Sequence, residues 1–260
     1  MLIRRFIPLV LALAPAFVSA QSVRIASYNV AGLGERAKDY ATLARVINNF
    51  DVVAALEVKG GKGVEKVLSL LADGWTAAVS DTEEQAEQYK ESFGFFYNER
   101  VELYRMLGPY RGDGQFVRPP YGANFKVKGT GLAFNLVACH VDPGLGPRAR
   151  AAEIDQLGDV YKYFEKLTGN RGMTIIAGDF GEERSPAFRA LTAQAGQQVL
   201  PAKATTMSGS GRAEDRIFVS PALRPMVEKA DVFYWTRDWN AFRSSVSDHF
   251  PVYLVLKAGR

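Results

Sequence analysis

The chain contains two histidines, and each lies at one end of a short apolar run. His140 closes "NLVACH", and His249 follows Asp248 in "SDHFPVYL", directly before another run. Histidine changes charge near neutral pH, and a carboxylate partner determines which ring nitrogen holds the proton and raises the pKa. Both histidines are therefore candidates for general acid–base catalysis, although a lone histidine is more often a structural group.

Four further polar residues lie at the ends of other apolar runs. Asn29 follows "RIASY", Glu57 follows "DVVAAL", Asp179 follows "TIIAG", and Asp215 opens "DRIFVS". A single acid at such a position is more often a turn or helix-cap residue. As a set, together with Asp248, they offer the hard oxygen ligands that suit magnesium, manganese or calcium better than zinc.

Short apolar runs alternate with helical patterns along most of the chain. Apolar residues three and four apart predict helices at 43–50, 64–71 and 154–167. Strands are predicted at 23–28, 52–56, 92–98, 101–106, 133–138, 174–177, 216–219, 231–234 and 252–256. This order predicts one α/β domain over residues 21–260, with mixed sheets, helices outside them, and the polar strand ends facing a cleft.

The first twenty residues form a separate pattern. Arg4 and Arg5 precede an apolar run at 6–18, and small residues lie before the bond that follows Ala20. This pattern predicts a secretory signal peptide over residues 1–20, cleaved after Ala20. The alternative is an N-terminal anchor, which the short, proline-interrupted run disfavours. We therefore expect a secreted or periplasmic protein without a stable membrane anchor.

Charge and cysteine content limit the choice of partners. The formal charge is +4 and falls by two without Arg4 and Arg5, so binding to nucleic acid needs basic residues concentrated locally. Cys139 is the only cysteine, which rules out an internal disulfide. No feature implies a protein partner, and we expect a monomer.

Seven motifs, in order along the chain, carry a resemblance to a known superfamily. They are "RIASYNVAGLGER", "DVVAALEV", "YKESFGFFYNERV", "ACHVDP", "IAGDF", "EDRIFVS" and "SDHFPVYL". From Arg24 to Leu256 the chain resembles the deoxyribonuclease I-like endonuclease/exonuclease/phosphatase superfamily, and it looks most like the secreted deoxyribonuclease I branch. The resemblance implies a four-layer α-β-β-α sandwich with two packed mixed β-sheets, and magnesium-dependent hydrolysis of DNA with little sequence preference.

The resemblance also implies two catalytic histidine–carboxylate pairs around the scissile phosphate. His249 would pair with Asp215 on the general-base side, and His140 with Glu91 on the leaving-group side. Which histidine acts as the base stays open. Asp179 would bind a second ion or orient water.

The metal ligands and substrate contacts follow from the same resemblance. Glu57 and Asp248 would bind the divalent cation, magnesium or alternatively manganese or calcium, with Asn29 close by. The contacts to DNA as substrate would be Lys59 and Tyr89 in the minor groove and Arg118 on a phosphate. Lys59 is equally well explained as a solvated charge, and Tyr89 as a packed surface ring.

One departure from the superfamily pattern bears on activity. Most members carry an asparagine two residues after the aspartate of "GDF", and this chain has Gly181 there. Loss of one such hydrogen-bond donor typically slows a reaction by roughly a hundred- to a thousand-fold. The chain is thus either a weakened nuclease or a phosphate- or nucleic-acid-binding module that does not cleave.

A third hypothesis keeps the fold and changes the substrate. A sphingomyelinase-like or phosphatase activity on lipid or small phosphate esters would use a membrane-contact loop. The aromatic stretch "DVFYWTRDWNAF", residues 231–242, is a candidate for that loop, and the alternative is that its rings belong to the core and its surface.

Overall fold

The structure is a computed structural model that describes residues 22–81, 91–113, 116–142, 144–169, 171–194, 197–200, 203–207 and 211–259. The expected signal peptide over residues 1–20 and the substrate contact Tyr89 lie outside these residues. No helix in the described ranges is both long and apolar enough to cross a bilayer.

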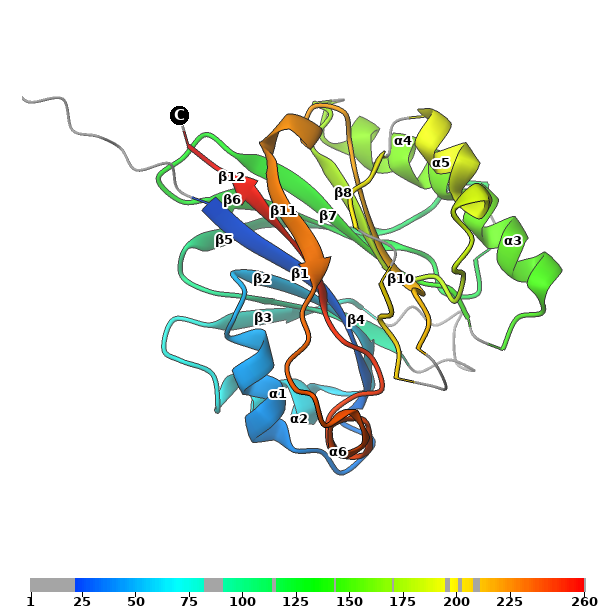
Figure 1. Ribbon diagram of the computed structural model, residues 1–260. Coiled ribbons are helices and arrows are strands. Elements are labelled where there is room, and N and C mark those ends of the chain that lie inside the picture. Colours follow the sequence, from blue (N-terminus) through cyan, green and yellow to red (C-terminus); the bar gives the residue numbers. More distant parts are fainter. Residues whose placement is uncertain are drawn as a thin grey trace, which may run out of the picture.

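Two six-stranded sheets form the centre of the molecule (Figure 1). The first has the order β11 (Val227–Val232), β12 (Val252–Lys257), β1 (Ser22–Leu33), β2 (Val52–Val58), β4 (Ser92–Tyr97) and β3 (Thr76–Val79). The second has the order β5 (Val101–Pro109), β6 (Tyr121–Val127), β7 (Ala133–His140), β8 (Thr174–Asp179), β10 (Asp215–Val219) and β9 (Gln197–Gln198). Each sheet contains one parallel pair, β1–β2 or β7–β8, among antiparallel pairs, so both sheets are mixed.

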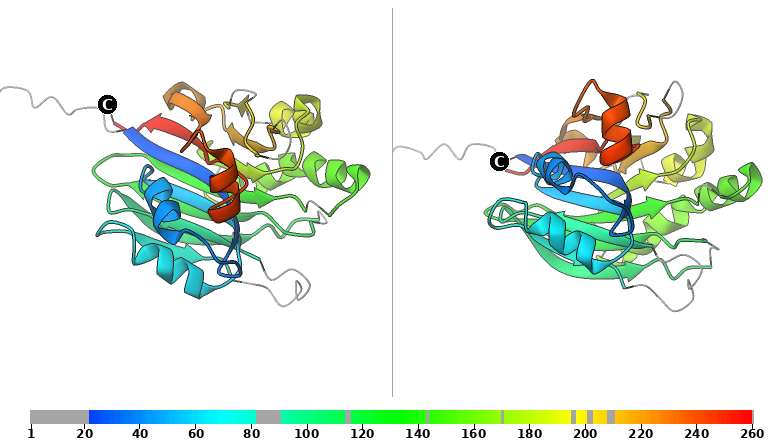
Figure 2. Two further views of the ribbon diagram at one scale, coloured as in Figure 1. Left: turned by 60° about the horizontal axis from the view of Figure 1, so that its bottom comes forward. Right: turned by 90° about the horizontal axis from the view of Figure 1, so that it is seen from below.

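Helices cover the outer face of each sheet. On the side of the first sheet lie α1 (Tyr40–Ile47), α2 (Gly61–Leu68) and α6 (Trp239–Ser245), as the view from below in Figure 2 shows. On the side of the second sheet lie α3 (Pro147–Asp155), α4 (Leu157–Leu167), α5 (Arg189–Gln194) and the short 3-10 turn Ser185–Phe188. A second 3-10 turn, Arg224–Met226, leads into β11. The predicted four-layer α-β-β-α sandwich with two packed mixed β-sheets is confirmed.

Two apolar clusters hold these layers together. The larger contains inward-facing residues of both sheets, such as Phe95 and Phe125, whose ring centroids lie 6.1 Å apart. The smaller lies between the second sheet and its helices and includes Phe164 and Phe218. Burial of this kind stabilises a fold by roughly 25 cal/mol for each Å² of apolar surface removed from water.

The structure corrects several predicted boundaries. The helix expected at 154–167 is two helices, α3 and α4, which meet at Gln156. The strand expected at 231–234 is β11, which ends at Val232. Strands β3, β6 and β9 were not predicted. β3 is a short half-exposed edge strand, and β6 carries glycine, asparagine and lysine that weaken the strand pattern.

The aromatic stretch at 231–242 packs largely onto the protein itself. The ring of Phe233 lies 5.3 Å from that of Phe50, and the ring of Trp239 lies 5.3 Å from that of Phe250. Tyr234, the exposed ring of the stretch, stacks on Trp239 and donates from its hydroxyl to the carbonyl of Ala204. The core-and-surface explanation of these rings therefore fits the structure better than a membrane-contact loop.

Candidate active site

Three of the predicted residues form one row across the second sheet. In the strand register, Asp179 of β8 pairs with His140 of β7 on one side and with Asp215 of β10 on the other. Side chains paired in register point to the same face of a sheet. All three are buried. The ends of three strands thus bring together residues that are far apart in the sequence.

The first sheet adds Asn29 and Glu57 opposite this row. The pairing of β1 with β2 becomes irregular after Asn29, and that of β2 with β4 between residues 55 and 58. In these bulges Ala31 and Glu57 have φ values of 50° and 59°, a left-handed backbone that costs a non-glycine residue about 1–2 kcal/mol. Asn29 Nδ2 donates to Glu57 Oε1 at 2.9 Å and to Asp179 Oδ2 at 3.1 Å, so it links the two sheets.

His249 lies between two carboxylates. Its Nδ1 is 2.9 Å from Asp215 Oδ2, and its Nε2 is 3.6 Å from Asp179 Oδ2. Burial lowers the pKa of His249, but the charges of Asp215 and Asp179 outweigh burial and raise this pKa to about 10. Without metal or substrate, the imidazole therefore holds its proton at neutral pH.

Two hydroxyl groups that sequence analysis did not single out position this pair. Ser247 Oγ donates to the carbonyl of Asn29 at 2.6 Å and accepts from the backbone N–H of His249 at 3.1 Å. Thr205 Oγ1 accepts from the backbone N–H of Asp215 at 3.0 Å. The serine two residues before the histidine in "SDHF" was the available signal, whereas the role of Thr205 depends on a tertiary contact that no local pattern shows.

His140 faces a second carboxylate surrounded by cations. Its Nδ1 is 3.3 Å from Glu91 Oε2, which also lies 3.1 Å from Arg118 Nε, and Lys59 Nζ is 3.7 Å from Glu91 Oε1. Burial raises the pKa of Glu91, but His140, Arg118 and Lys59 outweigh burial and lower this pKa. Glu91 therefore stays ionised next to His140.

Two of the expected substrate contacts are occupied by these pairs. Arg118 is largely buried, with Nη2 also 3.7 Å from Asp142 Oδ1. Lys59 forms an ion pair with Glu35 at 2.9 Å. In this state both cations bind carboxylates of the protein. A phosphate that contacted Lys59 or Arg118 would have to share that cation with its acidic partner.

The ring nitrogens of the two histidines converge on one carboxylate oxygen. His140 Nε2 lies 3.9 Å from Asp179 Oδ2, and the Nε2 of His249 lies 3.6 Å from the same oxygen. His140 Nε2 is also 3.9 Å from Glu57 Oε1. With Asn29, which donates to both carboxylates, five of the predicted residues thus surround a single small region.

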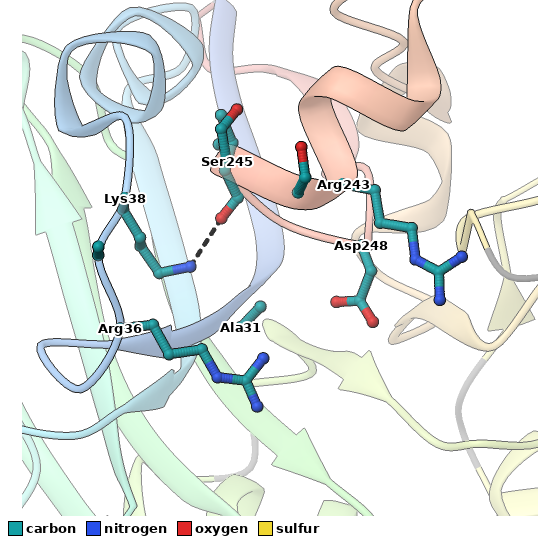
Figure 3. A pocket seen from close by; sticks show the side chains of 9 residues that line it. Ala31, Arg36, Lys38, Arg243, Ser245 and Asp248 are labelled. Atoms are coloured by element: carbon teal, nitrogen blue, oxygen red, sulfur yellow. Dashed lines mark hydrogen bonds between the residues drawn. The ribbon is translucent and has the colours of Figure 1, made fainter.

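Asp248 lies at the edge of this region, in a neighbouring pocket. Its half-buried carboxylate lines a cavity of about 200 Å³ together with Arg36, Lys38 and Arg243 (Figure 3). The contacts of the described residues do not join Asp248 to Glu57, its expected partner in binding a metal.

The chemistry of the donors fits a hard divalent cation. Asp179, Asp215 and His249 each offer one potential ligand atom, and these three atoms lie within 4.8 Å of one another. His249 is a poor ligand in this set, because Asp215 occupies one ring nitrogen and the raised pKa keeps a proton on the other. The carboxylates of Glu57 and Asp179 are better placed, since Asn29 holds both.

Gly181 lies two residues beyond Asp179 and has a φ of 57°. Its N–H donates to Asp179 Oδ1 at 3.0 Å, and Arg150 Nη1 donates to its carbonyl at 2.7 Å. A Cβ atom at this position would lie 3.5 Å from the Arg150 guanidinium, an ordinary contact distance. The structure thus places Arg150 against the loop of the site.

Comparison with known proteins agrees with the fold and with the order of the motifs. The chain is 28% identical over 279 residues to deoxyribonuclease-1 of Oryctolagus cuniculus, covering 95% of this chain and 96% of that protein. It is 27% identical over 282 residues to a deoxyribonuclease of Thioalkalivibrio, covering 98% of this chain and 77% of that protein. The chain resembles the deoxyribonuclease I-like proteins over nearly its whole length. No protein-family model matches it.

Solved structures show the same architecture. An endonuclease/exonuclease/phosphatase family protein of Bacteroides thetaiotaomicron matches with a TM-score of 0.65 at 20% identity, covering 91% of this chain and 95% of that one. A mannosyl-6-phosphatase of the same organism matches with a TM-score of 0.64 at 18% identity, covering 89% and 98%. At these identities the likeness establishes the fold, which serves more than one kind of phosphate ester.

Proposed function

We propose that this chain is a secreted or periplasmic, divalent-metal-dependent phosphodiester hydrolase that cuts DNA with little sequence preference. The observation that carries the proposal is the convergence of two histidine–carboxylate pairs on one oxygen of Asp179. Hydrolysis of a phosphodiester requires a base for the attacking water and an acid for the departing oxygen, and two oriented imidazoles supply both. The similarity to deoxyribonucleases along the chain supports DNA as the substrate.

The protonation of His249 supports a division of roles between the two pairs. His249, held as an imidazolium between Asp215 and Asp179, is suited to donate a proton. His140, oriented by Glu91, then accepts the proton of the attacking water. The resemblance placed His249 on the general-base side but left the choice of base open, and this division makes His140 the base.

The chemical step balances with these two groups. Water oxygen forms a bond to phosphorus, and its proton passes to His140. The bond from phosphorus to the departing sugar oxygen breaks, and that oxygen takes the proton of His249. Glu57 and Asp179, with Asp248 at the edge, would hold a magnesium ion, with manganese or calcium as alternatives, and a bound cation would stabilise negative charge on the phosphate oxygens.

A comparison of substrate classes tests the proposal. The purified protein is incubated in magnesium buffer with one substrate at a time. The substrates are supercoiled plasmid, a sugar phosphate and sphingomyelin vesicles. We expect cleavage of the plasmid and little release from the other two. Preferred hydrolysis of the sugar phosphate or the lipid would overturn the proposed substrate, and retention of plasmid without cleavage would favour the binding-module alternative that Gly181 suggests.

A further inference from the structure

We propose that the pocket beside Asp248 is a phosphate-binding subsite, which holds a second phosphate group of a polynucleotide while the scissile one lies between the histidines. This inference rests on the proposed function. The pocket is formed by the loop between β1 and α1, the end of α6 and the turn before β12 (Figure 3). Its cavity of about 200 Å³ admits a phosphate group.

The charge of the pocket favours an anion. Arg36, Lys38 and Arg243 line it, and Asp248 is the one acid among its lining residues. Within the described part of the chain, none of the three cations forms an ion pair within 4.0 Å, whereas Lys59 and Arg118 in the neighbouring site both do. Guanidinium groups are suited to phosphate because they present paired N–H donors.

The walls of the pocket are already joined before any ligand binds. Lys38 Nζ donates to the carbonyl of Val246 at 2.7 Å, and the N–H of Asp39 donates to the carbonyl of Ser245 at 2.7 Å. Asp39 in turn caps α1, because its Oδ1 accepts from the N–H of Thr42 at 2.9 Å. A pocket built in this way loses little conformational entropy when it binds.

Lys38 is partly buried close to a second cation, Arg36. Burial and then the charge of Arg36 lower the pKa of Lys38, whereas Glu57 and Asp248 raise it, and the net direction is downward. An anion in the pocket would relieve the repulsion between these cations. The same observation places Lys38 within electrostatic reach of both predicted metal-site acids.

The position of the pocket explains why the ligand would belong to a polymer. Asp248 immediately precedes His249, so the pocket and the histidine pairs lie on two sides of the same turn. A strand whose scissile phosphate lies at Asp179 continues past this turn with further phosphates. A small monoester has no second phosphate to place there. Contacts of this kind position a nucleic acid without reading its sequence.

The salt dependence of DNA binding tests this subsite. Binding of a short fluorescent duplex is measured over a series of salt concentrations, in a chelator that prevents turnover, for wild type, Arg36→Gln, Arg243→Gln and the double variant. Each phosphate contact contributes about 0.9 to the slope of log K against log salt. We expect each single variant to lower that slope by about one and the double variant by about two.

Arg224→Gln is the matched control. Arg224 is exposed and makes no ion pair in the described part of the chain. It lies just before Val227, where β11 begins, and this end of the strand is the one farther from His249. We expect it to keep the wild-type slope. If the double variant is folded and shares the slope of Arg224→Gln, the subsite is wrong. Because binding is measured without turnover, a chain that never cleaves DNA would refute the proposed function while the slopes still decide on the pocket.

Discussion

The protonation state of His249 follows from the residues that enclose it. Two carboxylates lie within 3.6 Å of its ring nitrogens, and their charges outweigh the effect of burial on its pKa. In the metal-free protein this arrangement links stability to pH, because a proton held more tightly in the folded than in the unfolded state stabilises the fold.

The sign of that linkage gives the first prediction. The pKa of His249 is raised from 6.5 to about 10, so its contribution is complete below pH 6.5 and disappears as the pH rises towards 10. We expect the Tm of the chelator-treated wild type to fall between pH 7 and 10. In Asp215→Asn the decrease should be smaller, because one of the two charges that raise the pKa is removed. If Tm fell with pH equally in the two proteins, the result would contradict the ion pair between His249 and Asp215.

Gly181 is the residue at which the chain departs most clearly from the pattern of the superfamily that it resembles. Its left-handed backbone, with φ of 57°, is one that asparagine accepts more readily than most residues, and its Cβ position is sterically open to ordinary contact with Arg150. We expect Gly181→Asn to raise the rate of DNA cleavage, by up to roughly a hundredfold, because the new amide can donate to a phosphate oxygen.

Kinetics on plasmid DNA at saturating substrate provide the measurement for Gly181→Asn. Gly181→Ala serves as the control, since it adds the Cβ atom at the same backbone angle without a donor. An unchanged or lower kcat for Gly181→Asn, with an unaltered Tm, would show that the missing donor does not limit this site.

At the scale of strands and helices, the site depends on close pairing of β7 with β8. Gly178 precedes Asp179, and a Cβ atom at Gly178 would lie 1.8 Å from the carbonyl oxygen of Cys139. We expect Gly178→Ala to destabilise the fold by at least about 1–3 kcal/mol, because the strands must separate to admit the methyl group. Thermal unfolding checks this against Gly131→Ala, where no atom lies within 4 Å of the new Cβ. Equal Tm values for the two variants would contradict the close approach.

The strands that carry the site were also the elements easiest to predict. β7 and β8 are largely apolar, buried strands that end at His140 and Asp179, and the apolar run of β12 begins shortly after His249, so the positions of these three residues were visible in the sequence. The pairing of His140 and Asp215 with Asp179 was not visible, because register depends on contacts between distant segments. The bulges at Ala31 and Glu57 carry no signal either, since neither residue favours a left-handed backbone.

At the scale of the whole molecule, the site lies at the seam between the two sheets. Asn29 from the first sheet donates to Asp179 of the second, and Ser247 fastens the turn that carries His249 to the backbone of β1. The relative placement of the sheets therefore sets the distances between His249, His140 and the carboxylates of Glu57 and Asp179. The resemblance anticipated this architecture, whereas composition and periodicity alone predicted only an α/β domain with mixed sheets.

The same placement separates basic residues that are paired with acids from basic residues that are available to an anion. Lys59 and Arg118 bind carboxylates of the site, while Arg36 and Arg243 remain without acidic partners in the described part of the chain. A formal charge of only +4 is thus compatible with DNA binding, because the unpaired cations are concentrated beside the histidines.

The proposal that two histidines hydrolyse DNA is tested most directly by plasmid nicking. Wild type and His249→Ala are each incubated with supercoiled plasmid, once with magnesium and once with a chelator. We expect the wild type to nick the plasmid only with magnesium, and His249→Ala to lose at least about a hundredfold in rate, because the proton donor for the departing oxygen is gone. A folded wild type that leaves the plasmid intact, or a His249→Ala variant as active as the wild type, would contradict that mechanism.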